Sequence, residues 1–328
     1  MRIATFAAPL GRDGPGLMLR DLGRADVQID AVVAIVAQVN PDILLLTDVD
    51  FDADGLALDA LADRMGFAHA FALRPNTGMA TGLDLDGNGY LGDARDAQGY
   101  GTFNGAGGMA LLSRWPVQTD AVRDLSSLLW RDMAGATLPE GPLWTEDIAA
   151  TQRLSTTGHW IVPVAAPNGP VTIMAFSATP PVFDGPEDRN GLRNADEVRL
   201  WAQVLDGLHG PAPQDAVIVG NANLDPADGD GLRDVMVGFL SDPRLTDPEP
   251  RSAGGMAAAD ADHAGNPALD TADWPDGAPG NLRVSYVMPT AGFTVTDSGV
   301  FWPAPDDPDA AMANAAGPHR LVWVDLSR

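Results

Sequence analysis

The segment Ala216–Pro226, with the sequence AVIVGNANLDP, carries the clearest structural signal in this chain. Its first four residues are apolar and mostly β-branched, which is typical of a buried strand. Gly220 ends the run, and the amides Asn221 and Asn223 follow it. Polar side chains just past the carboxyl end of a buried strand are where layered α/β folds place binding and catalysis. Alternate extended residues point the same way, so both amides are expected on one face, with an Asn-rich capping turn as the alternative.

Strand-like and helix-like segments alternate on both sides of this stretch. Each half of the chain runs strand, helix, strand and then further strands, which predicts two packed sheets with helices outside, in one domain spanning residues 1–328. Irregular loops are expected over Ala72–Gly108 and Pro248–Pro279. The expected helices are Asp26–Val39, Leu56–Met65, Glu197–Leu208 and Leu232–Leu240. The other expected strands are Arg2–Phe6, Asp42–Leu46, Met109–Leu112, Arg153–Val164, Val171–Phe176, Val284–Met288 and Leu321–Asp325.

Amino-acid composition excludes several kinds of binding partner and site for this protein. The formal net charge is −25, and all 20 basic residues are arginine. A field this negative repels the phosphate backbone, so duplex nucleic acid is not an expected partner. The absence of cysteine excludes disulfides, thiolate metal sites and a cysteine nucleophile. No run of 18 apolar residues is present, so membrane insertion is not expected. The first residues read as a core strand, which predicts a cytoplasmic protein, or an extracytoplasmic one if a leader has been removed.

The segment Ala216–Pro226 resembles the Gly-Asp-x-Asn signature of the endonuclease/exonuclease/phosphatase superfamily, and the likeness is greatest to a bacterial branch. This resemblance implies the DNase-I-like fold, a four-layer α/β sandwich of two mixed β-sheets flanked by helices. It also implies a phosphoesterase in which carboxylates hold Mg²⁺ and an Asp orients or deprotonates the attacking water. The other segments that carry the resemblance are Arg2–Phe6, Asn40–Leu46, Gly107–Arg114, Thr179–Gly191, Pro279–Val284 and His319–Val324.

Most of the family's functional positions are nevertheless altered in this chain. The catalytic Asp is replaced by Asn221, which cannot act as a base at any accessible pH. The matching residues are Asn223, His319 and His159, the last without a clear role. The other changes are Ala7 for an Asn, Asp48 for a metal-binding Glu, Ser177 for a His, Ser285 for an Asp and Pro318 for an Asp.

An intact scaffold with altered chemical positions favours a pseudoenzyme whose cleft binds a small polar ligand or a protein partner. Loss of one member of a cooperating catalytic unit typically costs factors of thousands. With one carboxylate left, Asp48, the ancestral site is expected to bind Mg²⁺ weakly at most. We expect Thr179–Asn190 and Thr271–Asn281 to rim the cleft, with Trp274 near its mouth. Two alternatives stay open: a calcium-stabilised extracellular structural module, and an active metal-dependent phosphoesterase on a small phosphoester using Asp48, Asn223, His159 and His319.

A second feature is a potential calcium loop. Asp84, Asp86, Asn88 and the Tyr90 carbonyl match the first seven positions of an EF-hand loop, with Gly89 at the sixth. Arg95 stands at the twelfth, where a bidentate Glu belongs, and Asp93 or Asp96 could supply the missing carboxylate. The pattern predicts either bound Ca²⁺ or an ordered loop without an ion. The similar run Asp225–Asp230 is weaker and is expected to be a solvated turn.

Overall fold

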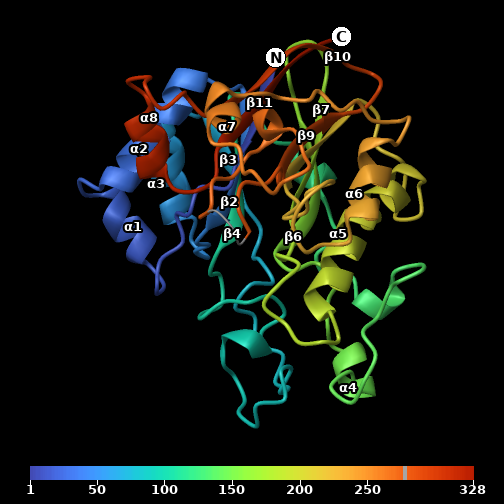
Figure 1. Cartoon of the computed structure of the whole chain (residues 1–328). Helices are drawn as coiled ribbons and strands as arrows, with labels where there is room; N and C mark the ends of the chain where they lie inside the picture. Colours follow the sequence, from blue (N-terminus) through green and yellow to red (C-terminus); the bar gives the residue numbers. More distant parts are fainter. Residues whose placement is uncertain (276–278) are drawn as a thin grey trace.

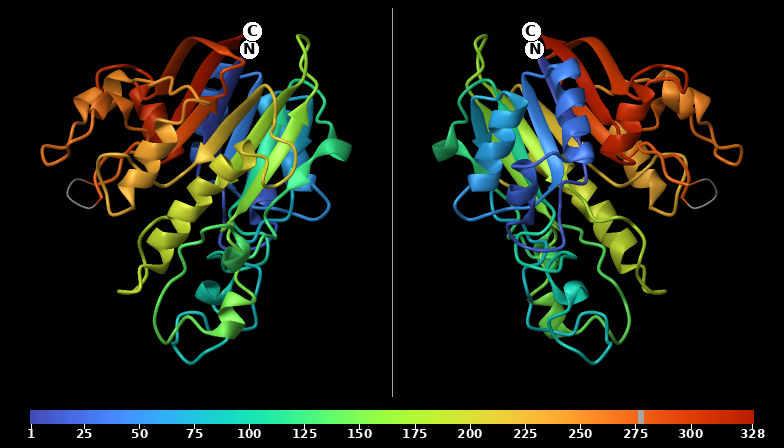
Figure 2. Two further views of the ribbon diagram at one scale, coloured as in Figure 1. Left: turned by 90° about the vertical axis from the view of Figure 1, so that its right-hand side faces the viewer. Right: turned by 90° about the vertical axis from the view of Figure 1, so that its left-hand side faces the viewer.

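The computed structural model describes residues 1–275 and 279–328. Its strands form two mixed β-sheets, packed face to face with helices outside (Figures 1 and 2), as the resemblance implied. The first sheet has the order β10 (Thr294–Phe301), β11 (Leu321–Ser327), β1 (Arg2–Phe6), β2 (Ile43–Val49), β4 (Gly108–Ser113) and β3 (His69–Phe71). The second has the order β5 (Arg123–Asp124), β6 (Gly158–Val164), β7 (Val171–Ser177), β8 (Ala216–Asn221) and β9 (Ser285–Pro289).

The central strand β8 is apolar along its length because both of its faces are covered. Val217 and Val219 pack between the two sheets, whereas Ala216 and Ile218 pack under the outer helices. A strand buried on both sides reads as a continuous apolar run, which is the pattern seen in its sequence. A Cβ at Gly220 would overlap the Phe176 carbonyl of β7, so this position requires glycine.

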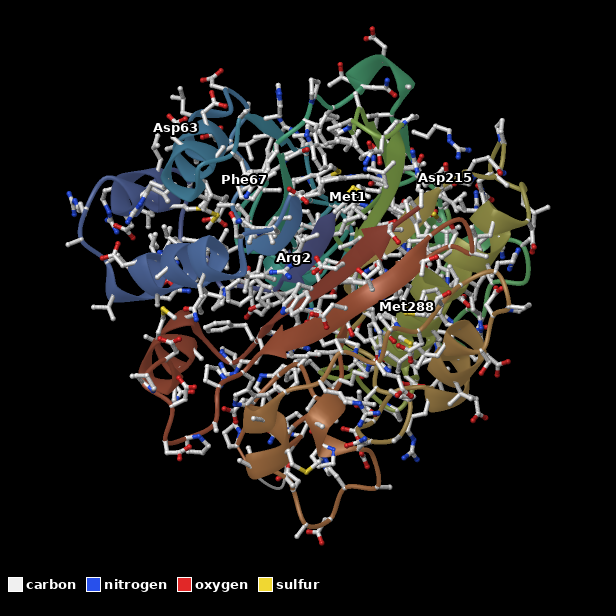
Figure 3. The ribbon with its side chains drawn as sticks, turned by 90° about the horizontal axis from the view of Figure 1, so that it is seen from above. Met1, Arg2, Asp63, Phe67, Asp215 and Met288 are labelled. Atoms are coloured by element: carbon white, nitrogen blue, oxygen red, sulfur yellow. The ribbon has the colours of Figure 1, made fainter. Side chains whose placement is uncertain are left out.

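Helices form the two outer layers. In the view from above (Figure 3), Asp63 and Phe67 lie on one outer side and Asp215 on the other, with Met1 and Arg2 between them. The helices on the first sheet are α1 (Leu17–Leu22), α2 (Val27–Val39), α3 (Leu56–Met65) and α8 (Ala310–Ala316), and those on the second are α5 (Arg189–Leu205) and α6 (Arg233–Leu240). Short elements in loops are α4 (Glu146–Ala149), α7 (Ala253–Ala257), η1 (Ala94–Asp96), η2 (Thr119–Ala121), η3 (Trp130–Asp132) and η4 (Pro267–Leu269).

Several boundaries differ from the sequence-based expectation. The strand expected from Arg153 begins only at Gly158, and α5 begins at Arg189 rather than Glu197. The first turns of α5 are polar, and their buried side chains are held by hydrogen bonds rather than by apolar packing, so periodicity missed them. The edge strand β10 is largely exposed and polar in its first half, and it was not expected. No helix in the described residues is long and apolar enough to cross a membrane.

Candidate functional site

A cavity of about 930 Å³ opens at one end of the sandwich. Both chain termini lie at the opposite end, whereas the loop between β3 and β4 and the loop carrying α4 project at the cavity end (Figures 1 and 2). Strand ends form the floor and these loops form the walls. The floor residues are Ala7, Thr47, Asp48, Ser177, Asn221, Asn223 and His319.

Three of the altered positions lie in one row across the second sheet. Ser177 on β7 pairs with Asn221 on β8, and Asn221 pairs with Ser285 on β9. Cross-strand partners point to the same face of a sheet, so these side chains follow the inner row that packs between the sheets. Ser177 and Asn221 line the cavity, and Ser285 is fully buried beside them. The Ser285 hydroxyl has no hydrogen-bond partner within the described part of the chain.

The two asparagines after β8 are fixed by their own turn. Asn221 Oδ1 accepts a hydrogen bond from the Asn223 backbone N–H at 3.1 Å, and Asn223 has a left-handed backbone with φ 49°. Asn223 Nδ2 donates to the Ala178 carbonyl at 2.8 Å. These bonds hold the side-chain oxygen of Asn221 and the side-chain nitrogen of Asn223 in place. No described residue bonds to the Asn221 amide nitrogen or the Asn223 amide oxygen, so both can meet a ligand in the cavity.

Asp48 is the carboxylate on the floor. It sits at a β-bulge of β2 with φ 61°, and its carbonyl accepts the N–H groups of Leu10 and Gly11. The residue as a whole is exposed at the cavity, but its carboxylate lies close against Gly11 and Gly107. Burial of the carboxylate against the floor and repulsion from Asp50 raise its pKa from 3.8 to about 6. Asp50, which the sequence had not singled out, accepts the backbone N–H groups of Arg12 and Gly107.

His319 precedes β11 and also lines the cavity. Trp274 packs edge-to-face on its ring, with centroids 5.1 Å apart, as expected for an aromatic residue near the site. Burial and the neighbouring Arg320 lower the pKa of His319 from 6.5 to about 4, so the ring is neutral at pH 7. Its Nδ1 has no partner among the described residues. Pro318 lies outside the lining, where its carbonyl accepts the Asp273 N–H.

His159 is a core residue and not part of this group, which corrects its assignment to the site. It is fully buried, and its ring lies 4.9 Å from that of Trp201 and 5.5 Å from that of Phe176. Nδ1 pairs with the Ser155 hydroxyl at 2.7 Å and Nε2 with the Glu197 carbonyl at 3.0 Å. Burial lowers its pKa to about 4, so His159 is a neutral, fully bonded packing residue.

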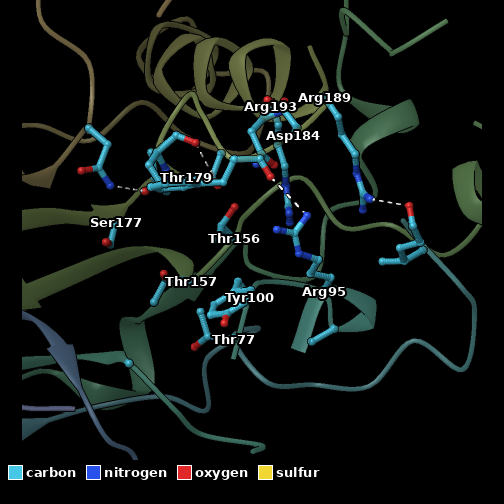
Figure 4. Close-up of a pocket in the computed structure, with 18 of the residues that line it drawn as sticks. Thr77, Arg95, Tyr100, Thr156, Thr157, Ser177, Thr179, Asp184, Arg189 and Arg193 are labelled. Carbon is cyan, nitrogen blue, oxygen red and sulfur yellow. Dashed lines mark hydrogen bonds between the residues drawn. The ribbon is translucent and has the colours of Figure 1, made fainter. Parts of the chain in front are cut away.

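The cavity walls contain residues that the sequence gave no reason to select. Thr77, Thr156 and Thr157 present hydroxyls (Figure 4), and the exposed side chains of Tyr100 and Phe183 stand at the mouth. No local motif marks these residues, because they come from loops that meet only in the folded chain. Thr179–Asn190 contributes to the wall as expected. Of the second expected rim, residues 276–278 lie outside the described residues, and none of the others lines the cavity.

The wall arginines are largely engaged by protein groups. Arg189 donates to the Leu85 carbonyl and the Gln152 side chain, and Arg193 donates to four backbone carbonyls. Arg193 also lies beside Glu197, a fully buried carboxylate that accepts the backbone N–H groups of Thr156 and Thr179. These contacts fix the wall. Arg95, in contrast, is exposed and makes only a 3.5 Å contact with the Phe183 carbonyl.

The candidate calcium loop brings together three carboxylates. Oxygens of Asp84, Asp86 and Asp96 lie within 4.8 Å of one another. Asp93 instead caps η1 and accepts from the Asn88 side chain. The Asn88 side-chain oxygen accepts the Tyr90 backbone N–H. Of the two carboxylates considered as replacements for the missing Glu, Asp96 lies in the cluster with Asp84 and Asp86, whereas Asp93 contacts Asn88.

The sequence matches the model of the Endonuclease/Exonuclease/phosphatase family over residues 16–323. The chain therefore belongs to this family, and the fold agrees with that assignment. No curated protein matches the sequence.

Solved structures of the same architecture come from several bacteria. A family protein from Beutenbergia cavernae DSM 12333 is 19% identical with a TM-score of 0.58, and the match covers 99% of this chain and 71% of that one. One from Leptotrichia buccalis C-1013-b is 13% identical with a TM-score of 0.53, over 100% of both chains. A variant of the 3′ phosphatase NExo from Neisseria, bound to a product DNA hairpin, is 18% identical with a TM-score of 0.51, over 100% of both chains. Identities this low show a shared fold.

The divalent metal that the family implies does not fit the floor described here. Mg²⁺ is bound through carboxylates in near-octahedral geometry. The candidate ligands are one carboxylate, Asp48, and neutral amide and hydroxyl groups, and position 7 has no polar side chain at all. Asp50 is buried behind the floor and does not line the cavity.

Proposed function

We propose that this chain is a pseudoenzyme of its family, which has lost metal-dependent phosphoester hydrolysis and binds a small polar ligand in the retained cavity. The observation that carries the proposal is the row Ser177, Asn221 and Ser285, in which neutral side chains occupy three adjacent strand ends. Hydrolysis needs a base and a cation at this place, and neither serine nor asparagine supplies them at ordinary pH. The cavity itself remains open and structured.

The test measures Mg²⁺ and Mn²⁺ binding by calorimetry, together with hydrolysis of aryl phosphomonoesters and phosphodiesters. The unmodified protein is expected to show neither. A matched variant carries Ser177→His, Asn221→Asp and Ser285→Asp, which restores three of the family's residues. Chelator-sensitive turnover by the unmodified protein, lost in His319→Ala, would overturn the proposal in favour of an active phosphoesterase.

We also propose that the loop of Asp84, Asp86 and Asp96 binds Ca²⁺. Three carboxylates this close repel one another without a cation, and Asp84 and Asp96 are held in place by backbone N–H groups of the loop. Carboxylate oxygens are the ligands that Ca²⁺ takes in flexible loops. Isothermal calorimetry on chelator-treated protein is expected to show one Ca²⁺ site that disappears in Asp84→Asn. Absence of that site in the unmodified protein would contradict the proposal.

A further inference from the structure

We infer that the cavity selects an uncharged, hydroxyl-rich ligand that carries an apolar group, such as a glycoside, in place of a phosphoester. This inference rests on the proposed function and names the class of ligand for the same cavity. It is carried by three features of the cavity: its unpartnered polar groups, the sign of its charges and its apolar mouth.

The first feature is a set of polar groups that no protein group satisfies. The Thr77 hydroxyl is buried, lines the cavity and has no partner among the described residues. The hydroxyls of Thr157 and Ser177 also line the cavity (Figure 4), and no described residue bonds to them. A buried polar group without a partner costs about 1–3 kcal/mol, so such groups call for water or a ligand.

These groups suit hydroxyls better than phosphate. Serine and threonine hydroxyls both donate and accept, the Asn221 amide nitrogen donates, and the Asn223 oxygen accepts. A phosphate oxygen accepts only, so it would leave the acceptors on the floor unpaired. A sugar hydroxyl donates and accepts at once, and can therefore satisfy both kinds of group.

The charge of the floor also disfavours an anion. Asp48 is the floor's ionisable acid, and His319 is neutral at pH 7. The guanidinium groups of Arg189 and Arg193 already donate to protein oxygens. A phosphate on this floor would therefore face a carboxylate, because the cavity's arginines, including the exposed Arg95, line the wall and not the floor. A cationic head would meet Asp48 on the floor, because the wall acids Asp86, Asp184 and Glu187 already face Arg189.

The third feature is the apolar mouth. Tyr100 and Phe183 are 69% and 76% exposed, yet both line the cavity, and Leu143 lines it at 43% exposure. Apolar and aromatic side chains that line a cavity supply its contacts to the apolar part of a ligand. An aromatic face can stack on the C–H side of a sugar or on an apolar substituent. The polar floor and apolar mouth together fit a ligand with a hydroxyl-rich head and an apolar tail.

The experiment uses the full chain and probes that share one tail and differ in the head. Calorimetry and thermal shift are measured at pH 7.5 with a panel of octyl hexosides below their micelle concentrations, with octyl phosphate and with octylamine. At least one octyl hexoside is expected to bind, at least ten-fold more tightly than the phosphate or the amine. The matching methyl hexoside is expected to bind more weakly because it lacks the tail.

Variants locate the binding. Asn221→Asp keeps the oxygen that accepts the Asn223 N–H but replaces the donor by a second carboxylate, and is expected to weaken hexoside binding ten-fold or more. Thr77→Val is nearly isosteric and removes only the hydroxyl, for an expected loss of about three-fold. Tyr100→Ala is expected to weaken octyl hexosides and leave methyl hexosides unchanged. Thr296→Val, at an exposed position on β10 away from the cavity, is the control and should match the unmodified protein.

The alternative outcomes separate this inference from the proposed function. Binding of octyl phosphate or octylamine without any hexoside would overturn the ligand class and leave a binding cleft. Release of inorganic phosphate from octyl phosphate would overturn the proposed function as well. No binding by any member of the panel, or hexoside binding unaffected by Asn221→Asp, would overturn the inference.

Discussion

The floor of the cavity and the Asp84–Asp96 loop differ in how many carboxylates they carry. The floor presents Asp48 among hydroxyl and amide groups, whereas the loop holds three carboxylates whose oxygens lie within 4.8 Å. A chain with a net charge of −25 therefore has few acids at the positions where its family holds a metal. The floor therefore has few charged groups because of the particular residues at its positions. The acidic composition of the whole chain would not produce such a floor.

The sharpest test of this comparison places a carboxylate into the floor. Ser285→Asp puts the family's residue at a fully buried position, and an uncompensated buried charge costs about 3–5 kcal/mol. We expect a loss of that size in the free energy of unfolding by urea at pH 8 with chelator present. The loss should shrink towards pH 5, where the new acid can take up a proton.

A matched control uses Ser127, which is exposed. Ser127→Asp should change stability by no more than about 0.5 kcal/mol. A Ser285→Asp variant as stable as this control would mean that the floor accommodates carboxylates and that the contrast with the loop is wrong.

The second test supplies the cation to the loop. Binding to the native state alone stabilises it by about 2.7 kcal/mol at a Ca²⁺ concentration one hundred times the Kd. We expect the unfolding free energy of the unmodified protein to rise with the logarithm of free Ca²⁺. In the double variant Asp84→Asn, Asp86→Asn this rise should vanish. Equal Ca²⁺ stabilisation of that variant would place the ion elsewhere.

The third test uses the pH dependence of Asp48. Its folded pKa is raised to about 6, so the folded state binds the proton more tightly than the unfolded state, whose value is near 3.8. The contribution of Asp48 to stability is therefore fully present below pH 3.8 and is lost as pH rises through 6. Because the residue as a whole is exposed at the cavity, we expect a loss of about 1 kcal/mol or less.

The measurement compares unfolding free energies of the unmodified protein and Asp48→Asn from pH 4 to pH 8. Relative to the unmodified protein, Asp48→Asn should become more stable as pH rises. A difference that does not vary with pH would show that Asp48 is not held against the floor as described.

The smallest expected effect distinguishes two neighbouring carboxylates of the loop. Asp93→Asn should alter Ca²⁺ affinity by less than about three-fold, because Asp93 caps η1 and lies outside the cluster, whereas Asp96→Asn should lower it by at least ten-fold. Calorimetry on the two variants gives the ratio directly. The reverse order of effects would assign the missing EF-hand ligand to Asp93.

The sequence by itself determined which of the family's functional residues are replaced on the floor. The replacement of Asp by Asn221, Ser285 and Pro318 can be recognised from the sequence, because each of these residues lies next to a motif that resembles the family's. The two-sheet sandwich was predictable for the same reason, since continuous apolar runs such as that of β8 depend on local composition.

Only the tertiary structure decided which polar and aromatic side chains are buried in the core and which line the cavity. His159 looked like a site residue, but its ring nitrogens bond to Ser155 and to the Glu197 carbonyl inside the core. Thr77, Thr157 and Tyr100 carry no local signal and reach the cavity only because two distant loops meet at one end of the sandwich. Burial and hydrogen-bond partners depend on contacts between segments far apart in the chain, and no local pattern encodes them.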